Sequence, residues 1–187
     1  MATNQAFITP LLQTLQSTSQ VVTTEFGKLS AEQLNWKANP QKWSIAQCLD
    51  HLMVVDSSYF PVFEQIAANT YQPNWLAKLG FGANWVGSYL LRTVSPQNKM
   101  TMQVPTAAWL PASSSLPADV VEQFAHHQQV LADKFTRVTA HLGVVMASPA
   151  SPFIIYTVRD ALAIIVAHQQ RHLQQAQNVK KLAGFAV

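Results

Sequence analysis

Residues 157–180 read TVRDALAIIVAHQQRHLQQAQNVK, and this stretch decides the fold class. Thr157 followed by Asp160 is a capping-box pattern, which is typical of a helix N-terminus. Apolar residues then recur at steps of three and four, as on a helix with one buried face. That face runs through Val158, Ala161, Leu162, Ile165, Ala176 and Val179. The stretch therefore predicts one long helix that ends at about Lys180.

Two histidines interrupt the apolar face of this helix. After Ala161 and Ile165, the next inward positions are His168 and His172. At this i, i+4 spacing their Cβ atoms lie roughly 5–6 Å apart, so both imidazoles can bind one metal ion. Histidines that are hydrogen-bonded within a core show the same spacing, because a buried polar group needs a partner. The pair alone favours neither interpretation.

Two earlier stretches have the same helical spacing. The first covers about residues 4–27, where Ile8 and Leu15 belong to the apolar face. The second begins at a capping box formed by Ser44 and Gln47, and Pro61 predicts a kink near its end. Each stretch predicts a helix with one face in the core.

Another long helix, the third in chain order, is predicted from Asp119, a capping residue, to just before Gly143. A second capping box, Ser30 with Gln33, indicates a short helical turn after the first helix. The chain has no internal repeat and no alternating strand pattern. The sequence therefore predicts an all-α fold, a bundle of four long helices in a single domain of residues 1–187.

The stretch between the second and third long helices is irregular. Glycines and prolines interrupt every period between residues 73 and 117, which predicts a short helix followed by a long loop. Residues 109–117, with three serines between two prolines, are the best candidate for a mobile excursion. Pro149 and Pro152 mark another loop. Core packing is expected for the five large indole side chains, which are Trp36, Trp43, Trp75, Trp85 and Trp109.

The composition excludes several classes of protein. Hydrophobic residues make up 49% of the chain and charged residues 11%, with a net charge of +3. The basic residues are scattered, so no nucleic-acid-binding stripe is predicted. The longest apolar run, residues 161–167, is too short to span a membrane, and residues 1–10 lack a secretory signal, which favours a cytoplasmic protein. A single cysteine, Cys48, excludes an intrachain disulfide and a cysteine-rich zinc site.

A third histidine can join the pair on the last helix. His51 lies beside the apolar face of the second helix, from which it can reach a facing helix as a third ligand. His126 and His127 are adjacent, so at most one of them faces inward, and His127 is expected to be partly exposed or to support a ligand rather than bind metal. His141 is expected to interact with carbonyls at its helix end.

Three segments together resemble the DinB-like superfamily. They are LSAEQLNW at 29–36, WSIAQCLDHL at 43–52 and the His168-x-x-x-His172 pair, whereas residues 70–117 carry no match. The resemblance implies an up-and-down four-helix bundle like those of the bacillithiol and mycothiol transferases. It also implies a divalent metal ion bound by His51, His168 and His172, and it implies that dimers are common.

An all-histidine site accepts zinc, nickel, copper or iron, and zinc or nickel is expected here. Three protein ligands leave a position open, as in catalytic sites, where the ion lowers the pKa of a water or thiol. The sequence therefore predicts a hydrolase or a low-molecular-weight-thiol transferase acting on a small molecule. A non-catalytic stress-response protein that binds metal or a small ligand is the alternative, and a purely structural bundle is a third possibility. No nucleic-acid or membrane partner is expected, and the composition permits a homodimer.

The shortage of acid–base partners argues against an enzyme. Asp56 lies five residues after His51, on nearly the opposite helix face, and Asp50 and Glu64 are expected at the surface. Cys48 is expected to be a small buried hydrophobe rather than a ligand. No well-placed general base accompanies the predicted ion.

Overall fold

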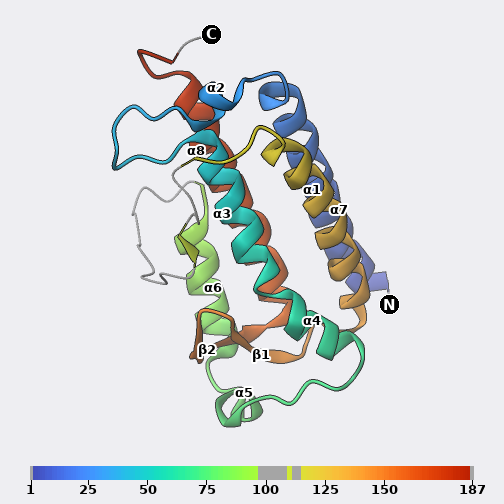
Figure 1. Cartoon of the computed structure of the whole chain (residues 1–187). Helices are drawn as coiled ribbons and strands as arrows, with labels where there is room; N and C mark the ends of the chain where they lie inside the picture. The colour runs from blue at the N-terminus through green and yellow to red at the C-terminus, as the bar shows by residue number, and fades with distance from the viewer. Residues whose placement is uncertain (1, 97–108, 111–114, 186–187) are drawn as a thin grey trace.

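The computed structural model describes residues 2–96, 109–110 and 115–185, which are mostly helical (Figure 1). The longest helices are α1 (Ala2–Phe26), α3 (Ile45–Ser57), α7 (Val120–Arg137) and α8 (Val158–Lys180). They lie side by side: α1 packs against α7 and α8, and α3 packs against the same two helices. The prediction of a mainly helical fold is confirmed.

Three helices begin at the predicted capping boxes. Ser30 caps the short helix α2 (Ala31–Asn35), Ser44 caps α3, and Thr157 caps α8. In each case the side chain accepts a hydrogen bond from the backbone N–H three residues later, an interaction that stabilises a helix by about 1 kcal/mol. Asp119 differs, because it occupies the N-cap position of α7 but its side chain makes no capping hydrogen bond.

The helix that was predicted to kink at Pro61 is in fact two helices. α3 ends at Ser57, and α4 (Phe60–Ala67) begins with Pro61 in its first turn, where a missing N–H is tolerated. α7 also ends earlier than the predicted stop at Gly143. A 3₁₀ turn, η2 (Thr139–His141), follows it.

The described part of the irregular stretch contains two helices, α5 (Trp75–Leu79) and α6 (Ala83–Val94), where one was predicted. α6 packs against α8, and a Cβ atom at Gly87 would lie 2.5 Å from the carboxyl carbon of Asp160. This glycine, which reads as a helix breaker, therefore permits the close approach of α6 to α8. Residues 97–108 of the predicted loop and residues 111–114 of the predicted excursion lie outside the described residues.

The stretch before α8 is a β-hairpin, so the prediction of a plain loop there was wrong. Strands β1 (Val145–Ser148) and β2 (Ser151–Thr157) pair antiparallel, with Val145 opposite Thr157 and Ala147 opposite Ile155. Pro149 stands in the turn, and a two-stranded sheet tolerates Pro152 because each of its strands has a free edge. The hairpin packs against α5 and α6.

A layer of polar side chains divides the core. One apolar cluster includes Phe63 and Phe135, and another includes Phe26 and Phe124. Where one cluster gives way to the other, all four long helices contribute a buried polar side chain. We call these residues the polar layer: Thr18, His51, Asp56, Gln128, Gln169 and His172.

The tryptophans divide into two groups. Trp36 and Trp43 pack against one core cluster and Trp109 packs against the other, as predicted. Trp75 and Trp85 are 66% and 72% exposed, so the prediction of core packing was wrong for these two.

Candidate metal centre

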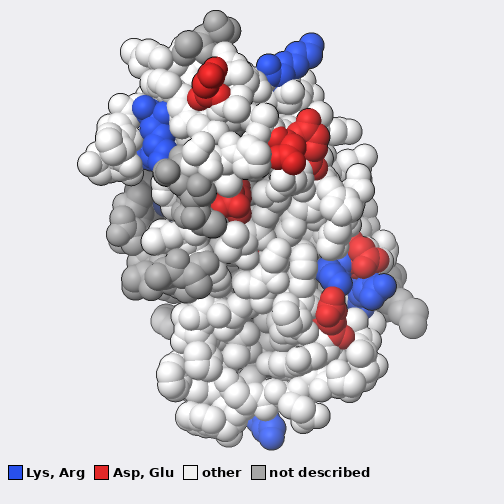
Figure 2. All heavy atoms as spheres, viewed as in Figure 1, with Lys and Arg blue, Asp and Glu red and all other residues white. Residues whose placement is uncertain are grey.

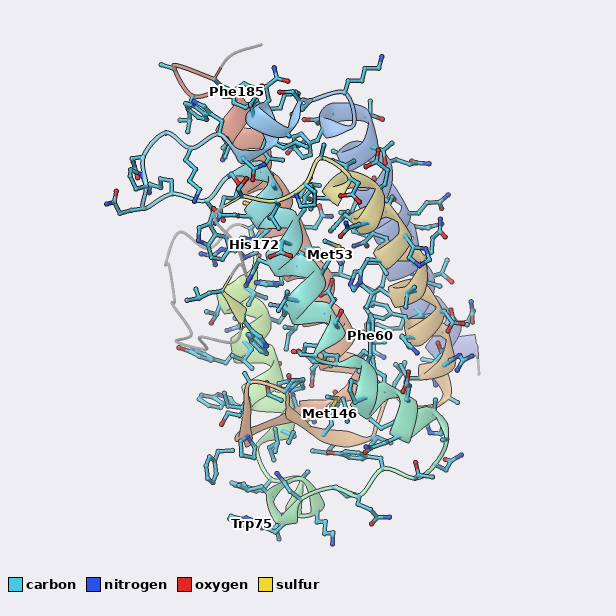
Figure 3. All side chains as sticks on the ribbon, in the orientation of Figure 1. Met53, Phe60, Trp75, Met146, His172 and Phe185 are labelled. Atoms are coloured by element: carbon cyan, nitrogen blue, oxygen red, sulfur yellow. The ribbon has the colours of Figure 1, made fainter. Side chains whose placement is uncertain are left out.

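The three predicted histidines meet between α3 and α8. His51 comes from α3, and His168 and His172 come from successive turns of α8, where His172 lies beside α3 (Figure 3). One nitrogen of each ring lies within 4.8 Å of the corresponding nitrogens of the other two. The adjacency of α3 and α8 is thus what brings a residue of the second long helix to the pair on the last one.

The nitrogen spacing fits a tetrahedral ion. The Nε2 atoms of His51 and His168 are 3.4 Å apart. Two ligands of one tetrahedral zinc, each at about 2.0–2.1 Å, are separated by roughly 3.3–3.4 Å. Without an ion this spacing is a poor hydrogen bond between two ring nitrogens. His51 and His168 therefore already have the separation of two ligands of one ion, and the third nitrogen, from His172, lies within 4.8 Å of both.

A backbone carbonyl fixes the orientation of His51. Its Nδ1 lies 2.5 Å from the carbonyl oxygen of Trp109, so the Nδ1–H donates to that oxygen. The Nε2 lone pair then remains free and points toward His168. Metal-bound histidines commonly have such a second hydrogen bond, which selects the tautomer and the ring orientation. Sequence reasoning missed this contact, because Trp109 acts through its backbone and lies in the unmatched stretch.

Burial keeps the three imidazoles neutral. It lowers the pKa of His172 to about 3, and it lowers the pKa of His168 well below its ordinary value. The neighbouring histidines and the charge of Arg171 lower both values further. Burial also lowers the pKa of His51, partly offset by its hydrogen bond to Trp109. Metal ligation requires the neutral form of histidine, which the cluster therefore offers at neutral pH.

Trp43 covers one side of the cluster. Its ring stacks on His172 with centroids 5.5 Å apart and an interplanar angle of 19°, and its centroid lies 4.7 Å from that of His51. Trp43 immediately precedes the Ser44 cap of α3, so the capping box also fixes the position of the indole. The ring restrains two of the imidazoles and keeps water from that side of the cluster.

Asp56 is not part of the histidine cluster, as its helical phase predicts, but it is not at the surface either. It is fully buried in the polar layer and accepts a hydrogen bond of 2.7 Å from the side-chain amide of Gln169. Nε2 of His127 lies 3.5 Å from the same carboxylate oxygen. His127 thus stays outside the cluster, as predicted. Burial raises the pKa of Asp56.

The other candidate residues also lie away from the cluster. Cys48 is buried and its pKa is raised to about 12, as for the small hydrophobe that was predicted. Glu64 is exposed and pairs with Lys134 at 2.6 Å. Among the described residues, the only group of three or more histidine, cysteine or carboxylate side chains placed to share an ion is the three histidines.

A family model described as the DinB superfamily matches residues 14–176, a range that includes all three histidines. No curated protein and no solved structure matches the chain.

Proposed function

The chain belongs to the DinB superfamily, and on this basis we propose that it is a metal-dependent transferase of a low-molecular-weight thiol. The proposed architecture is an up-and-down four-helix bundle of α1, α3, α7 and α8 in one domain. The packing supports this proposal, because α1 and α3 each contact both α7 and α8.

His51, His168 and His172 are the proposed ligands, and zinc or nickel is the proposed ion. The observation that carries the proposal is the convergence of three neutral imidazoles, of which His51 and His172 are buried and His168 is half-buried, with two Nε2 atoms 3.4 Å apart. Because three protein ligands leave at least one coordination position open, the site suits chemistry better than a purely structural role.

The cluster favours thiol transfer over hydrolysis. A hydrolase commonly uses a carboxylate to take a proton from water, and no carboxylate joins the three histidines in the described part of the chain. A bound divalent cation lowers the pKa of a coordinated thiol, which supplies a nucleophile at neutral pH without a separate base.

Three side chains would assist an anionic thiolate. The guanidinium of Arg171, held by a 2.9 Å hydrogen bond to the carbonyl of Thr93, places a positive charge near His168 and His172. His51 is held in one tautomer by Trp109. Trp43 excludes water from one side, where a low dielectric strengthens the attraction between a thiolate and these charges.

The test uses untagged protein loaded with zinc or nickel, because a histidine tag would bind the same ions. Metal content is measured first, and turnover is then followed with a panel of low-molecular-weight thiols and a fluorogenic electrophile. We expect one metal per chain and turnover that His168→Ala abolishes with helical circular dichroism unchanged. His126→Ala, at an exposed position outside the cluster, is the matched control.

Each failure has a separate meaning. Stoichiometric metal without turnover would support the non-catalytic binding protein instead. Metal-dependent cleavage of esters or amides without a thiol would favour the hydrolase. Absence of stoichiometric metal after reconstitution would refute both metal-based functions and leave the structural bundle.

A further inference from the structure

Large apolar side chains are exposed together at the end of the molecule that contains α5. They come from α5, the turn after it, the start of α6, and strand β2, which are neighbouring elements (Figure 1). Their exposed fractions run from 66% to 93%. We call this set the end patch: Trp75, Leu79, Phe81, Trp85 and Phe153.

The backbone holds the tip of the end patch outward. Gly80 ends α5 with φ 63° and Gly82 precedes α6 with φ 80°, both in the left-handed region that favours glycine. Phe81 lies between them and is 93% exposed, the most exposed large apolar side chain among the described residues. Because the conformation on both sides of Phe81 favours glycine, the turn has a specific backbone conformation that holds this side chain in solvent.

Two contacts give the rest of the end patch a fixed shape. Trp85 stacks on Tyr89 of the next turn of α6, with centroids 5.9 Å apart. The side-chain amide of Asn74 donates a 2.8 Å hydrogen bond to the carbonyl of Pro152, which ties the start of α5 to the strand that carries Phe153.

The exposed area is larger than that of a typical apolar surface patch. A fully exposed aromatic side chain presents about 150–250 Å², so the four aromatic residues of the end patch together expose on the order of 600 Å², to which Leu79 adds. The largest patch on a typical monomer is roughly 300–600 Å² and is often functional. Leaving this area in water is unfavourable at about 25 cal/mol per Å², so an occupant that buries it would gain free energy.

The charges around the end patch are exclusively positive in its own segments. Residues 71–96 contain Lys78 and Arg92 and no acidic residue, and residues 142–158 contain no charged residue. Figure 2 shows the α5 end of the molecule as uncharged surface with one basic side chain. Asp160, the acidic residue that lies against Gly87 of α6, is engaged in the capping box with Thr157. An occupant with negative charge therefore suits the end patch better than a positive one.

We propose that the end patch docks on the surface of a membrane that contains anionic lipids. Tryptophan and phenylalanine insert readily at the boundary of headgroups and acyl chains, and basic side chains bind anionic headgroups. A protruding phenylalanine inserts between lipids without a matching hollow. A second copy of the chain fits less well, because a two-fold interface centred on α5 would bring Lys78 near its own copy.

Docking of this kind does not need a spanning segment. None of the described helices is long and apolar enough to cross a membrane. The sequence predicted no membrane partner because no apolar run is long enough to span, but the end patch is assembled from short segments that are far apart in sequence. Trp75 also lies well away from His172 (Figure 3), so a docked molecule would keep the histidine cluster clear of the lipid.

The test is flotation of the purified full chain with vesicles of phosphatidylcholine alone or with 30% phosphatidylglycerol. We expect flotation with the anionic vesicles, weakened by salt. Because burial of one phenylalanine side chain is worth about a tenfold change in an equilibrium, Phe81→Ser should weaken binding about tenfold, and Trp85→Ser similarly. Leu182→Ser, a substitution at another exposed apolar residue near the C-terminal end of α8, is the matched control.

The fold is checked by circular dichroism, which should not change because these side chains are exposed. The proposal is overturned if the wild-type chain does not float with anionic vesicles, or if both end-patch variants float as well as the wild type. A dimer that Phe81→Ser converts to monomer, without flotation of either form, would assign the end patch to a second copy and also overturn it.

Discussion

Acidification should destabilise the metal-free protein through the histidine cluster. Burial lowers the pKa of His172 to about 3, whereas an unfolded histidine has a value of 6.5. Between these values the unfolded chain binds a proton that the folded chain does not. The contribution of His172 to stability is therefore present above about pH 7 and is lost progressively as the pH falls below 6.5.

The size of this effect follows from the two pKa values. At pH 5.5, one unit below the unfolded value, His172 alone lowers the free energy of unfolding by about 1.4 kcal/mol. His168 and His51, whose pKa values are also lowered by burial, act in the same direction. Asp56 acts in the opposite direction, because burial raises its pKa and the folded state then binds its proton more readily than the unfolded state.

The assay is urea unfolding of metal-free protein at pH 7.5 and pH 5.5, followed by circular dichroism, in the Asp56→Asn background so that this opposing effect is removed. Adding His172→Gln should reduce the loss of stability between the two pH values by about 1.4 kcal/mol. Adding His126→Gln, at an exposed position, should leave the loss unchanged. If His172→Gln loses as much stability on acidification as its parent, His172 is not held neutral in the folded protein.

Three further outcomes are expected. Gly87→Ala should lower the free energy of unfolding by about 1–3 kcal/mol in urea titrations, because its Cβ would overlap the carboxylate of Asp160, whereas Gly143→Ala, with nothing within 4 Å, should not. Asp56→Ala should cost about 1–3 kcal/mol in the same assay, because it leaves a buried amide without its acceptor, and Asp56→Asn should cost less. Zinc at a thousand times its Kd should add about 4 kcal/mol, or roughly 8–16 °C in Tm by calorimetry, and His168→Ala should remove this gain; a Tm that zinc does not change would contradict binding to the folded state.

Local signals in the sequence predict much of this structure. The capping boxes at Ser44 and Thr157 fix where α3 and α8 begin, because a cap is a contact within four residues of chain. Helical phase then predicts that His168 and His172 share one face. The helix starts were predicted better than the helix ends at Ser57 and Arg137, because a cap depends on local contacts whereas the position of these ends depends on tertiary packing.

Contacts between distant segments could not be predicted in this way. The hairpin forms from only a few residues on each side of Pro149, too few for a clear alternating pattern. The phase of Asp56 correctly predicted that it lies on nearly the opposite face of α3 from His51, but not that this face is buried, because α3 has both α7 and α8 as neighbours. The carbonyl of Trp109, 58 residues later in the chain, contacts His51. Because every residue has a backbone carbonyl, the pattern of side chains does not predict which one will accept this hydrogen bond.

The polar layer has a consequence for how the helices are aligned. If α8 slid by one turn along α3, Gln169 would leave the carboxyl group of Asp56, and both buried polar groups would lose their partner, an arrangement that costs about 1–3 kcal/mol. The polar layer therefore favours a single longitudinal alignment of α3 and α8. The same two helices carry His51 and His172, so this alignment also sets the spacing of the imidazoles in the metal-free protein. Little of the free energy of metal binding is then needed to order the ligands.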